Sequence, residues 1–270
     1  MTLFVTLCWI AMRPLVAGNW KMHGLKAQLG EIRAIAASVK AAPPDVDILI
    51  CPPSTLIERA VEAAQGMIAI GGQDCRPEAS GAFTGDISAQ MLKDDGAGAV
   101  IVGHSERRKY YAETDAQVAA KAFAAHKAGL MALICVGESK AEHDAGRALA
   151  FCADQIVHSV PKAMTGDDCA IGYEPLWAVG AHAAAKPEDI VEMHAHIRRT
   201  LVAHLGPAGQ SVRILYGGSV TASNARDILA LPEVDGVLVG RESLAFSNFE
   251  AIIGAAAAAH SREDLSHVKS

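Results

Sequence analysis

Short apolar runs recur along this chain, separated by longer amphipathic segments rich in alanine. The runs span residues 15–17, 46–51, 67–70, 99–102, 130–136, 169–171, 212–216 and 236–239. They are continuous rather than alternating, which is typical of strands buried on both faces. Regular alternation of such strands with helices predicts parallel βαβ units.

The segments between the runs are expected to be helices. They cover residues 27–41, 56–65, 88–95, 115–128, 146–160, 187–205 and 223–231, and a last alanine-rich helix is expected at about 249–259. Eight strand–helix units in 270 residues predict an α/β protein with a single domain, a closed (β/α)8 TIM barrel. The competing architecture is an open doubly wound sheet, but no G-x-G-x-x-G pattern follows the first run.

The two ends of the chain are expected to lie outside the barrel, which should span residues 13–260. Residues 2–12 are apolar but too short to span a bilayer, and no basic region precedes them as in a secretory signal. We expect residues 1–12 to be an N-terminal extension or the product of a start codon assigned too early. Residues 261–270 are expected to form a C-terminal tail.

The composition excludes several classes of function. A chain with 51% hydrophobic and 20% charged residues is expected to be a soluble globular protein with an ample core. The net charge of −6 and the absence of a basic cluster argue against nucleic acid as a partner, and no membrane segment is expected. Six scattered cysteines without a C-x-x-C pair indicate reduced thiols in a cytoplasmic protein. His194 and His196 point to different faces of a helix, so we expect both at the surface and no metal site.

Polar residues follow several predicted strands, at the end of the barrel where active sites form. Glu174 comes shortly after the run 169–171, is followed by Pro175, and precedes an apolar segment that ends at Gly180. A carboxylate covered by an apolar flap is desolvated, which raises its basicity and suits it to abstracting a proton. The alternative is a buried strand end with a structural ion pair.

Two further candidates follow the first and fourth runs. Lys21 places a positive charge for an anionic substrate, and Asn19 either holds Lys21 or donates to a substrate oxygen; a surface lysine is the alternative. His104 begins a helix, where the dipole favours a neutral imidazole that still donates a hydrogen bond. Glu106 either bonds to Lys21, relays protons or completes the helix cap.

Glycines follow the last two runs. Gly217 and Gly218 precede Ser219, and Gly240 follows the eighth run. Backbone N–H groups at such glycines approach an anion closely, and barrels often bind phosphate through the loops after strands 7 and 8. With the base, imidazole and lysine, this pattern favours proton transfer beside a carbonyl of a small phosphorylated sugar, a reaction that requires no metal or organic cofactor.

Taken together, these stretches resemble the triosephosphate isomerase family. The resemblance rests on residues 19–21, 81–86, 103–108, 135–138, 173–180 and 216–220, in order between about residues 14 and 249. It implies an intramolecular aldose–ketose isomerase of glycolysis and gluconeogenesis. Such an enzyme interconverts dihydroxyacetone phosphate and D-glyceraldehyde 3-phosphate through an enediolate.

The resemblance also implies a role for each catalytic candidate. Glu174 is the base that moves a proton between C1 and C2, and neutral His104 polarises the carbonyl. Lys21, held by Asn19 and Glu106, stabilises the negative charge of the enediolate.

Substrate binding and assembly are implied in the same way. The flap closes over a substrate held by Asn19, Lys21, Gly180, Ser219 and Gly240. We also count Arg241, which follows Gly240, among the candidate substrate-binding residues, although the resemblance does not imply it. The loop 81–86 resembles the family's interdigitating loop, which implies a homodimer in which Thr84 reaches toward the neighbour's active site.

The chain departs from the family pattern at the flap and at the phosphate loop. The flap reads Gly180-Ala181-His182 where the family usually has Gly-Thr-Gly. Arg241 replaces a glycine beside the phosphate, and Glu242 replaces a small residue. Arg241 either repels the anion, reaches round to bind it or points elsewhere. Two alternatives therefore stay open: an isomerase of a four-carbon ketose phosphate such as erythrulose phosphate, and a non-catalytic barrel.

Overall fold

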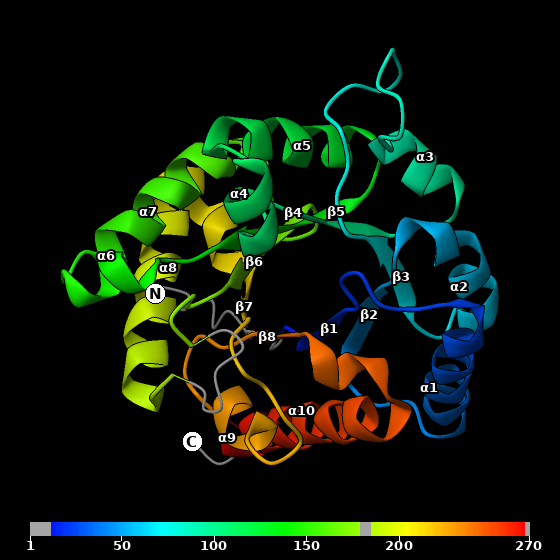
Figure 1. Ribbon diagram of the computed structural model, residues 1–270. Coiled ribbons are helices and arrows are strands. Elements are labelled where there is room, and N and C mark those ends of the chain that lie inside the picture. Colours follow the sequence, from blue (N-terminus) through cyan, green and yellow to red (C-terminus); the bar gives the residue numbers. More distant parts are fainter. Residues whose placement is uncertain (1–11, 179–184, 268–270) are drawn as a thin grey trace, which may run out of the picture.

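The fold is a closed barrel, shown in Figure 1 by a computed structural model that describes residues 12–178 and 185–267. Over these residues, eight strands pair side by side in chain order. They are β1 (Leu15–Asn19), β2 (Asp47–Cys51), β3 (Ala69–Gly72), β4 (Ala99–Val102), β5 (Met131–Val136), β6 (Cys169–Tyr173), β7 (Arg213–Tyr216) and β8 (Gly236–Val239). The predicted single-domain (β/α)8 barrel is confirmed.

The ring closes because β1 pairs in parallel with both β2 and β8. Leu15 lies opposite Asp47 on one side and opposite Gly236 on the other. Side chains inside the barrel, such as those of Leu133 and Leu215, form one apolar core, and those that face the helices form a second. Both faces of each strand are therefore covered, which is why the strands read as continuous apolar runs.

Helices surround the barrel (Figure 1). They are α1 (Leu29–Ala41), α2 (Ile57–Ala64), α3 (Ala89–Asp94), α4 (Ser105–Tyr111), α5 (Asp115–Lys127), α6 (Lys140–Asp144), α7 (Ala148–Ser159), α8 (Pro187–Leu205), α9 (Ala225–Leu229) and α10 (Phe246–His267). Short 3-10 helices are η1 (Lys26–Gln28), η2 (Ser54–Leu56), η3 (Gly206–Ser211) and η4 (Arg241–Leu244). Helix α6 was not among the predicted segments, because so short a helix shows no apolar period. Helix α10 continues past the predicted end near residue 259.

His194 is fully buried on α8, so the prediction that it lies at the surface is wrong. Its ring packs against Tyr173 and Tyr216, and its Nδ1 lies 2.8 Å from the carbonyl oxygen of Glu233. Burial lowers the pKa of His194 to about 4, so the ring is neutral at neutral pH. In the described part of the chain, no cluster of histidine, cysteine or acidic residues is suited to a metal ion.

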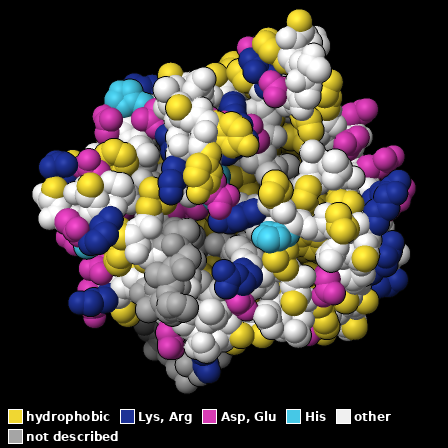
Figure 2. All heavy atoms as spheres, in the orientation of Figure 1, with side chains coloured by type: hydrophobic (Ala, Val, Ile, Leu, Met, Phe, Trp, Pro, Cys, Tyr) yellow, Lys and Arg dark blue, Asp and Glu magenta, His cyan; other side chains and the backbone are white. Residues whose placement is uncertain are grey.

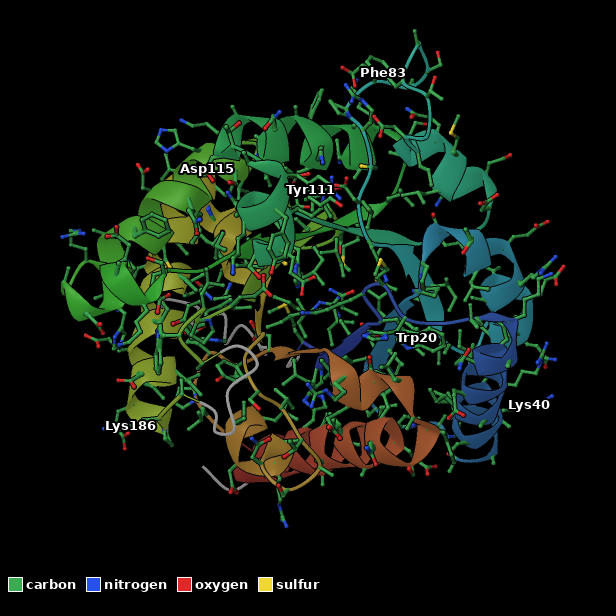
Figure 3. All side chains as sticks on the ribbon, viewed as in Figure 1. Trp20, Lys40, Phe83, Tyr111, Asp115 and Lys186 are labelled. Carbon is green, nitrogen blue, oxygen red and sulfur yellow. The ribbon has the colours of Figure 1, made fainter. Side chains whose placement is uncertain are left out.

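One long loop projects from the barrel between β3 and α3 (Figure 1). Phe83 lies near its tip (Figure 3), and residues 81–86 are all exposed. The guanidinium of Arg76 lies 3.8 Å from the centre of the Phe83 ring and pairs with Glu78 and Asp86. The loop is therefore held in shape by its own contacts. Within the described residues, no helix combines the length and the apolar character that a bilayer crossing needs.

Candidate active site

Most of the predicted site residues line one cavity of about 420 Å³ at the C-terminal ends of the strands, and Glu106 lines the cavity beside it. Its lining includes Asn19, Lys21, His104, Glu174, Ser219, Gly240 and Arg241. Figure 2 looks onto this end of the barrel, and basic and histidine side chains gather near the middle of the view. Gly180 and the altered flap residues lie outside the described residues.

Glu174 is buried at the end of β6 and is held by hydrogen bonds. The backbone N–H of Ser105 donates to Oε2 at 3.0 Å, the Ser105 hydroxyl donates to Oε1 at 3.3 Å, and Nε2 of His104 lies 3.0 Å from Oε1. Burial raises the pKa of Glu174, but His104, the Ser105 amide and the charge of Lys21 outweigh it and leave the pKa below its ordinary value. The predicted gain in basicity is therefore wrong for this arrangement, because these partners stabilise the carboxylate.

His104 is the residue that caps the N-terminus of α4. Its Nδ1 accepts a hydrogen bond from the N–H of Glu106 at 3.2 Å, which assigns the ring proton to Nε2. Burial lowers the pKa of His104, yet the carboxylate of Glu174 raises it, and the net pKa lies above the ordinary value. When Glu174 turns away, burial and the charge of Lys21 still lower the pKa of His104, and of the causes that raise it only the smaller effect of Glu106 remains.

Lys21 is held in place by both its backbone and its ammonium group. Nζ lies 2.7 Å from Oε1 of Glu106, which confirms the predicted contact, and the backbone N–H donates to Oδ1 of Asn19 at 2.9 Å. Lys21 has a left-handed φ of 52°, a conformation that costs a residue with a side chain about 1 kcal/mol. Gln73, which the sequence did not single out, donates to the Lys21 carbonyl at 2.8 Å and helps to hold this conformation.

The glycines of the loop after β7 are required by packing. A Cβ on Gly217 would lie 3.0 Å from the Tyr173 carbonyl oxygen, and one on Gly218 would lie 2.2 Å from the Tyr216 hydroxyl. The N–H of Gly217 already donates to the Tyr173 carbonyl at 2.7 Å, so it is not free for an anion. Gly240 differs, because a Cβ there would meet nothing nearer than Cε of Lys21 at 3.9 Å. The backbone at Gly240 is therefore open to the cavity.

Two residues after β5 support the site, although the sequence analysis assigned them no role beyond a matching motif. Glu138 is buried and accepts hydrogen bonds from Nε1 of Trp177 at 2.6 Å and from the hydroxyl of Tyr173 at 3.1 Å. Gly137 packs so closely that a Cβ on it would lie 1.9 Å from the Glu174 carbonyl oxygen. The start of the flap and the backbone of Glu174 are both fixed by this turn.

Comparison with known proteins identifies the family. The triosephosphate isomerase profile matches residues 14–256. A protein named triosephosphate isomerase from Caulobacter vibrioides is 50% identical over 252 residues, which cover 93% of this chain and 100% of that protein. One of the same name from Afipia carboxidovorans is 53% identical over 242 residues, covering 89% of this chain and 96% of that protein.

A solved structure shows the same relationship. The crystal structure of triosephosphate isomerase from Bartonella henselae matches with a TM-score of 0.84 and 44% sequence identity. The match covers 90% of this chain and 99% of that one. Sequence profile, curated relatives and fold agree over nearly the whole chain, so this chain belongs to the triosephosphate isomerase family.

Proposed function

We propose that the protein interconverts dihydroxyacetone phosphate and D-glyceraldehyde 3-phosphate, the isomerisation used in glycolysis and gluconeogenesis. The observation that carries this proposal is the convergence of a buried carboxylate, an imidazole and an ammonium group on one cavity. Relatives named triosephosphate isomerase, at about 50% identity over most of the chain, support it. No observation favours the four-carbon substrate.

The proposed base is Glu174. It takes a proton from the carbon beside the carbonyl and returns it to the neighbouring carbon. In the structure, the carboxylate is held by Ser105 and His104, so it must turn away from them to reach the substrate. Losing these hydrogen bonds in a water-excluded site raises the pKa of Glu174, which makes the carboxylate a stronger base when it meets the substrate.

The proposed electrophiles are His104 and Lys21. Negative charge builds on the carbonyl oxygen as the proton leaves. His104 then donates from Nε2, since its Nδ1 is occupied by the Glu106 amide. The ammonium of Lys21 adds positive charge and is aimed by Glu106 and by the Asn19 contact to its backbone. Groups fixed before the reaction stabilise the enediolate without reorganising during it.

Phosphate binding is assigned to the loops after β7 and β8, with Ser219 and Gly240 as donors. The Ser219 carbonyl accepts a hydrogen bond from Nδ2 of Asn224 at 3.0 Å, which fixes the loop beside the cavity. Gly240 presents open backbone to the same cavity. Gly180 keeps its predicted role as a flap donor, and Asn19 and Lys21 complete the substrate-binding set.

The assembly we assign is a homodimer formed through the loop 81–86, with Thr84 at the neighbour's active site. Exposed apolar side chains, such as those of Met22 and Tyr111, support an interface beside the site. A second cavity of about 660 Å³, lined in part by Lys21, Met22 and Tyr111, adjoins the site and offers space for a loop tip.

The remaining assignments concern location and chain ends. We assign the protein to the cytoplasm, which is supported by the free, buried state of the cysteines in the described residues. We keep residues 1–12 as a proposed extension; of the residues predicted as a C-terminal tail, 261–267 continue helix α10. The chemistry proposed uses side chains alone and calls for no cofactor.

A coupled assay of triose phosphate turnover tests the function. We expect rapid conversion of D-glyceraldehyde 3-phosphate and little or none of erythrulose phosphate. Faster turnover of the four-carbon ketose phosphate would overturn the substrate assignment. Loss of turnover in both assays would favour a non-catalytic barrel.

A further inference from the structure

Arg241 is an exposed arginine on the wall of the active-site cavity, and among the described residues no carboxylate pairs with it. Other arginines at cavity walls are neutralised. Arg76 pairs with Asp86, and Arg213 at the opposite end of the barrel pairs with Asp47. An unpaired guanidinium in a cavity is free to bind an incoming anion.

Glu242 lines the same cavity but does not neutralise its neighbour. Its carboxylate instead accepts a hydrogen bond from Nδ2 of Asn248 at 2.8 Å. The short helix η4 is held by Nε1 of Trp20, which donates to the Ser243 carbonyl at 2.9 Å. The backbone that carries the arginine and the glutamate is therefore fixed, and the glutamate is directed to Asn248 rather than to Arg241.

The charges of the cavity show why a further cation is needed. Lys21 is already paired with Glu106, while Glu174 and Glu242 add two carboxylates to the wall. A phosphate dianion that enters this cavity shares it with both carboxylates, and like charges repel. Among the described residues of this wall, Arg241 is the lysine or arginine that has no carboxylate partner and can offset them.

We infer that Arg241 binds the phosphate group of the substrate through its guanidinium and makes the site selective for doubly charged phosphate. This inference rests on the proposed function. The guanidinium is planar and always charged, and its parallel N–H groups match two phosphate oxygens. Because Gly240 precedes it with open backbone, the side chain starts beside the amides of the phosphate loop.

Calorimetric titration with inorganic phosphate tests the contact without turnover. Arg241→Gln is expected to weaken phosphate binding by about five- to tenfold. Arg241→Lys should weaken it less, because lysine keeps the positive charge but lacks the parallel N–H groups of the guanidinium. Arg59→Gln removes an exposed arginine from α2, which lies outside the cavity, and serves as the control with unchanged binding. Circular dichroism confirms that each variant is folded.

Steady-state kinetics add a readout that a structural role would not produce. Removing a contact made equally in substrate and transition state raises KM far more than it lowers kcat. Arg241→Gln is therefore expected to raise KM with little change in kcat. The difference in KM from the wild type should become smaller at high salt, because salt screens an exposed charge.

A double-variant cycle separates direct contact from simple charge offset. If Arg241 touches phosphate, Arg241→Gln weakens binding by a similar factor in the wild type and in the Glu242→Gln background. The inference is overturned if the penalty vanishes in that background, or if Arg241→Gln binds phosphate as the wild type does. If the proposed function itself is wrong, the result is different: the wild type would still bind phosphate but would not convert triose phosphate.

Discussion

Nε2 of His104 lies 3.0 Å from Oε1 of Glu174, so the proposed electrophile and the proposed base are hydrogen-bonded to each other. The N–H of His104 and the carboxylate of Glu174 are therefore engaged with each other, although both are needed for the substrate. Binding has to separate them before a proton can move. The same separation raises the pKa of Glu174 and lowers that of His104, which are the directions that the reaction requires.

Shortening the base tests its role. Glu174→Asp withdraws the carboxylate by about 1 Å, and such a misplacement is expected to lower kcat by about 10²-fold. Affinity for inorganic phosphate should stay the same, since Glu174 makes no contact there. A coupled assay and calorimetry measure the two quantities. Unchanged turnover would show that another group is the base.

Removing His104 should move the acid limb of the pH profile. His104 is the main cause that lowers the pKa of Glu174, so His104→Gln raises that pKa in the free enzyme. The acid limb of kcat/KM, which reports the free enzyme, shifts to higher pH, and kcat falls by about 10²-fold. His158→Gln, on the exposed face of α7, is the control. An acid limb that stays in place would contradict the coupling.

His194 should make the fold sensitive to acid. Its pKa is lowered from 6.5 to about 4, so its contribution to stability is complete above pH 6.5 and is lost as pH falls toward 4. Linkage gives a loss of about 3 kcal/mol across this window. Denaturant unfolding at fixed protein concentration should show the free energy of unfolding falling between pH 6.5 and pH 4. In His194→Gln this dependence on pH should be weaker. Equal slopes in both proteins would exclude this residue as the cause.

The loop 81–86 should control assembly. Thr84→Arg places a charge where the proposed partner packs, and burying an unpaired charge is expected to weaken the dimer by at least about tenfold. Sedimentation velocity across a dilution series measures the effect, and activity per chain should fall with it. Val157→Arg, an exposed site on α7, is the matched control. A dimer as tight as the wild type would mean that the interface lies elsewhere.

The barrel could be predicted from the sequence because a strand buried on both faces appears as a continuous apolar run, which can be recognised one run at a time. Strands β1 and β6 were predicted too short, because Gly18 and Gly172 interrupt the apolar run although both continue the parallel ladder. The site residues could be placed together because parallel strands bring their C-terminal ends to one mouth. That reasoning depends on position in the chain alone.

Side-chain partners could not be predicted in the same way. Glu174 bonds to Ser105 and His104 across the barrel, and this contact reverses the direction of its expected pKa shift. His194 was placed at the surface because it lies two residues from His196 on a helix, and the spacing does not reveal its partner, the Glu233 carbonyl in a distant segment. For Arg241 the sequence left three orientations open. The orientation of such a side chain depends on which charged groups lie near it in the folded protein.

The close packing of Gly137 on the Glu174 carbonyl has a consequence for variation among sequences. Any side chain at Gly137 would push the base out of position, even though this residue takes no part in the chemistry. A mutational scan selected for growth on this reaction should therefore show an intolerant site at Gly137, as strict as at Glu174. From such a scan alone, Gly137 could not be distinguished from a catalytic residue, although its role is to pack against the backbone of Glu174.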